Sequence, residues 1–111
     1  MNDLSRALVA TFLEYLSIKL HKTIRGPYVW NENNCAHPGP PVEVWGMFVE
    51  DGVESIKLSN GDHIVEITYP IRNPQCFTIN HEHQDDGTHP MTDMTVIRAL
   101  VNAVNLIEFG A

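Results

Sequence analysis

The stretch Ile56-Lys57-Leu58-Ser59-Asn60-Gly61-Asp62-His63-Ile64-Val65-Glu66-Ile67-Thr68-Tyr69 decides the fold of this chain. Apolar and polar residues alternate on both sides of its centre, which is the pattern of a β-strand with one buried face. Asn-Gly between two such segments is typical of a two-residue hairpin turn in which both central residues have positive φ. The stretch therefore predicts two antiparallel strands joined by a tight turn at Asn60-Gly61.

Further strand-like segments extend this hairpin on both sides. Residues 42–50 have strand character and lead into Asp51-Gly52, and residues 76–81 follow a proline-bounded connection. Tyr28-Val29-Trp30 is a shorter candidate strand. Short turns between successive strands predict an antiparallel meander of three or four strands.

Helical periodicity flanks the meander. Apolar residues recur at steps of three and four over residues 3–22 and again over residues 92–108, as expected for amphipathic helices. Thr92 is the expected N-cap of the second helix, and Thr95 is expected to face away from the core. The predicted apolar stripes consist of Leu8, Phe12, Leu16 and Leu20, with Val9, Leu13 and Tyr15 beside them, in the first helix, and of Met94, Ile97, Leu100, Val101, Val104 and Ile107 in the second. The order helix, strands, helix predicts a single α+β domain over residues 1–111, a two-layer sandwich with both helices on one sheet face.

The charge balance disfavours several classes of partner. Fourteen acidic and seven basic side chains give the 111 residues a formal charge of -7 at pH 7. Nucleic acids and anionic membranes are bound largely through Lys and Arg, so neither is an expected partner. No segment approaches the roughly 20 apolar residues of a membrane span, and none resembles a signal peptide. Cys35 and Cys76 are therefore expected to be reduced thiols in a cytoplasmic protein.

Side-chain parity divides the predicted sheet into two faces. His63, Val65, Ile67 and Tyr69 share one face, while Glu43 is expected to point to water on the other. The interface candidates on this outer face are Trp45, Met47, Val49 and Ile64. Aromatic and methionine side chains are enriched at interfaces, so this face is a candidate for a protein partner or for self-association. Alternatively, Trp45 packs beneath the loop of residues 31–41.

The stretch of residues 81–89 holds three of the six histidines. Two residues apart on a strand, His81 and His83 are expected to project from one face, and Asp85 or His89 would add a third ligand for zinc or iron. The alternative is a polar connection whose histidines bond the backbone. A second candidate zinc site consists of Cys35, His37, Cys76 and His81.

The sequence contains no fixed-spacing catalytic motif, such as a phosphate-binding glycine loop, a nucleophile elbow or an H-E-x-x-H helix. It therefore predicts a small acidic cytoplasmic protein-binding module, namely an adaptor, chaperone or inhibitor that works without catalysis or cofactor. Small inhibitors encoded by phages and other mobile elements share this size and charge, and they act in the host cytoplasm. Two alternatives stay open: a zinc- or iron-binding protein or metal-dependent enzyme that uses residues 81–89, and a structural subunit of a larger, phage-like assembly.

Overall fold

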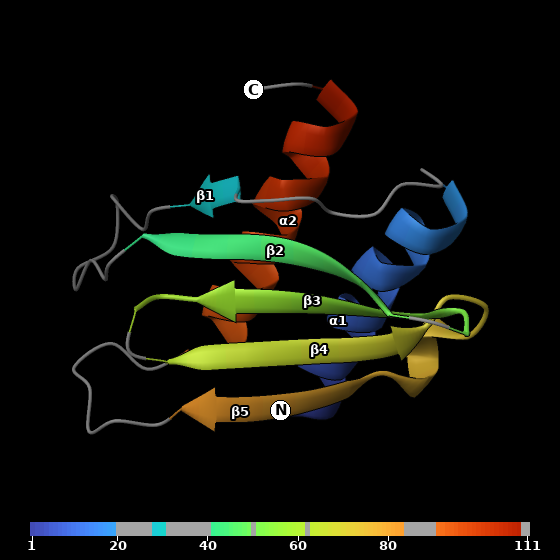
Figure 1. Cartoon of the computed structure of the whole chain (residues 1–111), viewed down its shortest axis with the longest axis horizontal. Coiled ribbons are helices and arrows are strands. Elements are labelled where there is room, and N and C mark those ends of the chain that lie inside the picture. The colour runs from blue at the N-terminus through green and yellow to red at the C-terminus, as the bar shows by residue number, and fades with distance from the viewer. Residues whose placement is uncertain (20–27, 31–40, 50, 62, 84–90, 110–111) are drawn as a thin grey trace.

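The computed structural model describes residues 1–19, 28–30, 41–49, 51–61, 63–83 and 91–109 (Figure 1). The elements are, in chain order, α1 (Asp3–Glu14), the π-helical turn η1 (Tyr15–Lys19), β1 (Tyr28–Trp30), β2 (Val42–Val49), β3 (Val53–Ser59), β4 (Ile64–Pro70), the 3₁₀ turn η2 (Pro74–Cys76), β5 (Thr78–His83) and α2 (Asp93–Phe109).

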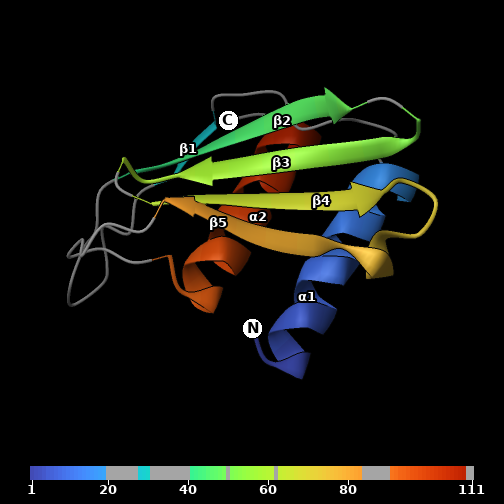
Figure 2. The same cartoon turned by 60° about the horizontal axis from the view of Figure 1, so that its bottom comes forward.

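The strands form one antiparallel sheet in the order β1-β2-β3-β4-β5, and every neighbour in the sheet is also the neighbour in sequence. Figures 1 and 2 show α1 and α2 side by side on one face of this sheet. The predicted α+β class and the placement of both helices are therefore confirmed. The sheet has five strands, whereas three or four were predicted. The additional strand is β1, because Tyr28–Trp30 pairs with the first residues of β2 as a short edge strand.

The core lies between the helices and the sheet face that they cover, here called the inner face. Burial along β4 alternates strictly, with Val65, Ile67 and Tyr69 fully buried, as parity predicts. The fully buried side chains opposite them are Val9 and Leu13 of α1 and Leu16 of η1. Complete burial of an aliphatic side chain stabilises a fold by roughly 1.5–3 kcal/mol, so these two layers supply most of the driving force for folding.

Each helix exposes one described residue of its predicted stripe, while most of the others are buried. Leu8 is 39% exposed and Met94 is 51% exposed, whereas Thr95 is buried. In α1 the Arg6 guanidinium lies 4.3 Å from the centre of the Phe77 ring, and Val9 is fully buried. In α2 the Thr95 hydroxyl hydrogen-bonds the Thr92 hydroxyl at 2.9 Å. A partnered hydroxyl is tolerated in a core, so the prediction that Thr95 faces away was wrong.

Side-chain caps start both helices. The Asn2 Oδ1 atom accepts from the Ser5 amide at 2.8 Å, and the Thr92 Oγ1 atom accepts from the Thr95 amide at 3.2 Å. Thr92 is thus the N-cap predicted for α2. The first helix was predicted over residues 3–22; its α-helical part ends at Glu14 and continues as η1 to Lys19, while residues 20–22 lie outside the described residues.

The tight turn follows Asn60 instead of being centred on Asn60-Gly61. The Asn60 amide donates to the His63 carbonyl at 3.2 Å, so these two residues flank the turn, and Gly61 has a φ of 96°. The Asn60 side chain instead accepts from the His63 amide at 2.8 Å, which is ordinary side-chain turn chemistry for Asn. Consecutive positive φ values occur at Asp51 (65°) and Gly52 (74°), between β2 and β3.

Candidate functional site

The sheet face that the helices leave uncovered, here called the outer face, is the largest candidate site that the described residues present. The strand register places its members in rows that cross the sheet, one of which joins Trp45, Lys57, Glu66 and Asn80. The described side chains of the outer face are Val29, Glu43, Trp45, Val53, Ser55, Lys57, Ser59, Ile64, Glu66, Thr68, Pro70, Thr78 and Asn80.

An exposed apolar pair marks the β1–β2 side of this face. Trp45 is 40% exposed and Val29 is 52% exposed. Val29 is the register partner of Glu43, so it is the diagonal cross-strand neighbour of Trp45, a separation that an aromatic side chain can bridge. The Trp45 Nε1 atom donates to the Glu43 Oε2 atom at 3.3 Å. This bond satisfies the only polar group of the indole and leaves its apolar surface available to a partner.

The remainder of the outer face is polar at its centre. The Ser55 and Thr68 hydroxyls hydrogen-bond at 3.2 Å between β3 and β4, and Lys57 stands directly opposite Glu66. Among the described side chains of the outer face, the exposed large hydrophobic ones are therefore those of Val29 and Trp45, at the β1–β2 edge. We call Val29 and Trp45 together the edge pair.

The four predicted interface residues do not all join the edge pair. Trp45 lies on the outer face, as expected. Ile64 also lies on that face but is half-buried on β4, two strands away from β2. Met47 and Val49 lie on β2 with outer-face parity, and the structure describes their backbone only. Val29 was missed, although the Tyr28-Val29-Trp30 alternation and the pairing of that strand with β2 would have assigned it to the outer face.

The predicted metal sites fall largely outside the described residues. Asp85, His89, Cys35 and His37 all lie there. Within the described part of the chain no three His, Cys, Asp or Glu side chains gather as a metal site. Cys76 is a free, exposed thiol whose Sγ atom accepts from the Asn73 Nδ2 atom at 3.1 Å. His81 is exposed on β5. Because most of the other candidate ligands lie outside the described residues, both metal sites stay predictions.

A β-bulge interrupts the regular alternation on which the His81–His83 prediction depends. His81 pairs with Val65 and His83 pairs with Ile64, which are adjacent residues of β4 on opposite faces. A two-residue step along β5 thus corresponds to a one-residue step along β4. Spacing of two residues alone is therefore no argument that both imidazoles project from one face.

The inner face carries a buried carboxylate that the sequence reasoning missed. Glu54 is only 3% exposed and is the cross-strand partner of the fully buried Tyr69. Burial, and then the neighbouring negative charge of Glu54, raises the pKa of the Tyr69 phenol far above its ordinary value of 10.0. Tyr69 therefore stays neutral at any physiological pH, and its hydroxyl is no proton-transfer group.

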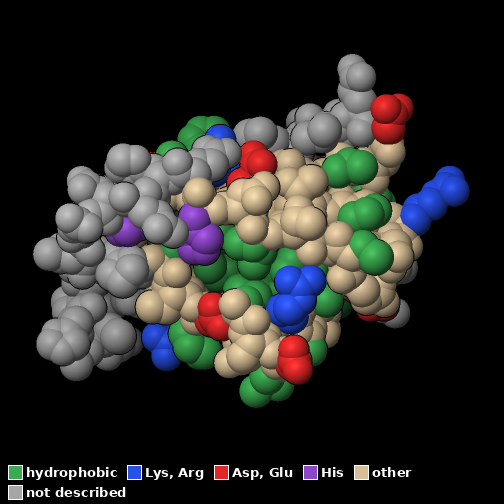
Figure 3. All heavy atoms as spheres, turned by 90° about the horizontal axis from the view of Figure 1, so that it is seen from below, with side chains coloured by type: hydrophobic (Ala, Val, Ile, Leu, Met, Phe, Trp, Pro, Cys, Tyr) green, Lys and Arg blue, Asp and Glu red, His purple; other side chains and the backbone are tan. Residues whose placement is uncertain are grey.

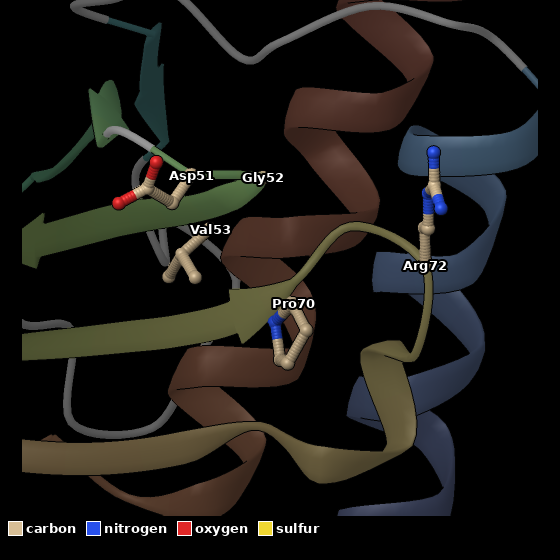
Figure 4. A pocket seen from close by; sticks show the side chains of 5 residues that line it. All are labelled: Asp51, Gly52, Val53, Pro70 and Arg72. Carbon is tan, nitrogen blue, oxygen red and sulfur yellow. The ribbon is translucent and has the colours of Figure 1, made fainter.

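An open pocket occupies the end of the sheet where the β2–β3 turn meets the end of β4. It is lined by Asp51, Gly52, Val53, Pro70 and Arg72 (Figure 4). The Asp51 and Arg72 side chains point away from each other in this view, so they do not form an acid–base pair across the pocket. The described residues that line this pocket therefore offer no converging pair of titratable side chains.

Comparisons with known proteins return no relative: no family model, no curated protein and no solved structure matches this chain. None of the helices in the described residues is both long enough and apolar enough to cross a lipid bilayer.

Proposed function

We propose that this chain is a small, acidic, non-catalytic protein-binding module of the cytoplasm, an adaptor, chaperone or inhibitor, and that it binds its partner through the outer face around the edge pair. The observation that carries the proposal is the one-sided helix layer, which leaves Trp45 and Val29 exposed together on the opposite face (Figure 2). Tryptophan is the residue type most enriched among the energetic hot spots of interfaces.

The surroundings of the edge pair fit a protein partner. Glu43 and Lys57 adjoin Trp45, along β2 and across the β2–β3 ladder. An aromatic anchor with charged groups at its margin is the usual composition of a protein interface, with an apolar centre and a polar rim. The formal charge of -7 favours a partner with a basic surface, because complementary charge accelerates association.

The proposal is tested by comparing Trp45→Ala with Phe109→Ala. Phe109 is a matched control because it is an exposed aromatic residue at the end of α2, on the helix layer. We expect partners captured by the unmodified chain from its native cells, quantified by mass spectrometry, to be lost with Trp45→Ala and kept with Phe109→Ala. Truncating a hot-spot tryptophan costs about 2 kcal/mol or more, a thirtyfold loss of affinity.

Circular dichroism and the melting temperature show whether each variant is folded. If a folded Trp45→Ala variant captures the same partners at the same affinity as the unmodified chain, the edge pair is not the binding site and the proposal fails.

A further inference from the structure

The dipeptide Asn60-Gly61, beside the turn between β3 and β4, is the one Asn-Gly pair of the sequence. An asparagine side chain loses its amide most readily before glycine, because glycine has no side chain to hinder its own backbone nitrogen. That nitrogen attacks the Asn Cγ atom and closes a succinimide ring, while the Nδ2 group leaves as ammonia with the proton that the Gly nitrogen gives up. Water then opens the ring to aspartate or isoaspartate.

The Asn60 side chain is held in place by the fold. It is only 7% exposed, and its Oδ1 atom accepts from the His63 amide at 2.8 Å. The Asn60 amide donates to the His63 carbonyl at 3.2 Å, which fixes the main chain at the same point. Ring closure requires the Cγ atom to move onto the Gly61 nitrogen, and hydrolysis requires water at that atom. Both bonds to His63 and the burial of the side chain therefore oppose the reaction.

The attacking nitrogen is directed elsewhere in the native turn. The Gly61 amide donates to the Ser59 Oγ atom at 3.3 Å. Once the proton has left, the electron pair that forms the new bond lies along the former N–H direction. In the folded chain this direction points to Ser59 and not to the Cγ atom of Asn60, so the turn has to rearrange before the ring can close.

Rearrangement of the turn requires the two strands beside it to part. β3 and β4 each have a neighbour on both sides in the order β1-β2-β3-β4-β5. Leu58 and Val65 pair across these strands close to the turn, and both are fully buried. Seen from the β5 side of the molecule, hydrophobic side chains lie between the sheet and the helices (Figure 3). Parting the strands exposes apolar surface of this kind to water, which makes the open state rare.

We infer that Asn60-Gly61 is a deamidation site that the native fold keeps inactive and that reacts only when the β3–β4 hairpin has opened. The reaction is irreversible, because ammonia is lost. Isoaspartate lengthens the main chain by one carbon atom between residues 60 and 61, so a hairpin that has reacted cannot form both bonds to His63 in the native register. The rate at which the folded chain is modified therefore follows the frequency of hairpin opening.

The rate of deamidation in the folded chain, compared with that in a synthetic peptide of residues 56–67, tests this inference. A single hairpin is at best marginally stable in water, so the peptide represents the open state. At neutral pH we expect the folded chain to react at least about tenfold more slowly than the peptide, because only its open fraction reacts. Urea below the unfolding transition should raise the rate of the folded chain toward that of the peptide.

Peptide mapping by mass spectrometry, together with labelling by an isoaspartate methyltransferase, measures both rates. Equal rates in the folded chain and the peptide would overturn the inference. A folded chain that reacts faster than the peptide would overturn it as well, and would show that the His63 amide activates the Asn60 carbonyl by polarising it.

Two leucine variants show whether opening controls the rate. Leu58→Ala removes a fully buried side chain close to the turn and should raise the rate in the folded chain about tenfold, while leaving the rate in the corresponding peptide unchanged. Leu4→Ala is the matched control, because Leu4 is 72% exposed on α1, and it should leave the rate unchanged.

A folded Leu58→Ala chain that reacts no faster than the unmodified chain would contradict the inference. If this variant does not fold, the urea series on the unmodified chain provides the same comparison, and a rate that does not respond to urea would contradict the inference. Partner capture by the outer face is a separate measurement, so either proposal can fail without the other.

Discussion

The two faces of the sheet consist of alternate residues of the same strands, but one face is covered by the helices and the other is not. On the inner face Val65, Ile67 and Tyr69 are fully buried beneath the helices, together with the carboxylate of Glu54. On the outer face serine, threonine and oppositely charged side chains surround one exposed apolar pair. Burial of the inner-face side chains therefore determines the fold, whereas the side chains of the outer face are not constrained by packing against the helices. The carboxyl group of Glu54 lies among apolar side chains on the inner face, and Trp45 lies among polar side chains on the outer face.

The largest expected difference between the faces is in the cost of removing an isoleucine. Ile67 and Ile64 are on the same strand, one fully buried and one half-buried on the outer face. Ile67→Ala should lower the free energy of unfolding by about 2–5 kcal/mol, because it removes core contacts and leaves a cavity. Ile64→Ala should cost about 1 kcal/mol, since only part of its side chain is shielded from water.

Urea denaturation monitored by circular dichroism measures both values. Equal losses for the two variants would mean that something covers the outer face as fully as the helices cover the inner one.

The next effect is a loss of stability at high pH that originates on the inner face. The pKa of Tyr69 is raised in the folded chain, so the unfolded chain loses this proton first, at its ordinary value of 10.0. The stabilising contribution is complete below pH 10 and is lost as pH rises above it, by up to about 1.4 kcal/mol per pH unit.

Tyr69→Phe should remove this part of the slope, so the two unfolding free energies, followed by urea titration from pH 9 to 11, should converge or cross as pH rises. Parallel curves would show that the phenol titrates alike in both states. Tyr15→Phe is the matching variant at a tyrosine on the surface. The pKa of Tyr15 is raised by the hydrogen bond that its hydroxyl donates to the Glu108 Oε2 atom at 2.6 Å.

The smallest effect belongs to the charged pair at the centre of the outer face. Lys57 and Glu66 are directly opposed on neighbouring strands, a geometry that contributes about 0.2–1 kcal/mol. Glu66→Gln should cost no more than that, and the difference should shrink in high salt because the pair is accessible to ions. A larger, salt-insensitive loss in thermal unfolding would indicate that this region of the outer face is shielded from solvent.

Periodicity was sufficient to predict the element order, the α+β class and the side of the sheet on which Trp45 lies. These properties depend on local alternation, which β4 follows without interruption. The burial of Thr95 was not predictable in the same way, because its hydroxyl hydrogen-bonds the Thr92 hydroxyl, a contact that periodicity does not contain. The turn follows Asn60 since the Asn60 side chain competes for the His63 amide.

The candidate site was predicted only in part. Trp45 followed from parity, whereas Val29 required the pairing of β1 with β2, a contact between strands separated by a long connection. Glu54 shares parity with Ile56 and Leu58, but the predicted strand began at Ile56 and so left it out. The bulge opposite His83 depends on the register of β4 with β5, which the spacing of two histidines does not reveal.

The contact between the two helices has a consequence for synthesis on the ribosome. α1 and α2 pack side by side, and the hydrogen bond from Tyr15 to Glu108 joins residues 93 positions apart. The strands between them pair only with their sequence neighbours, so the meander can assemble as it emerges. α1, in contrast, gains its full set of neighbours only after α2 has left the exit tunnel, and until then the nascent chain presents an incompletely covered apolar helix to the chaperones that wait there.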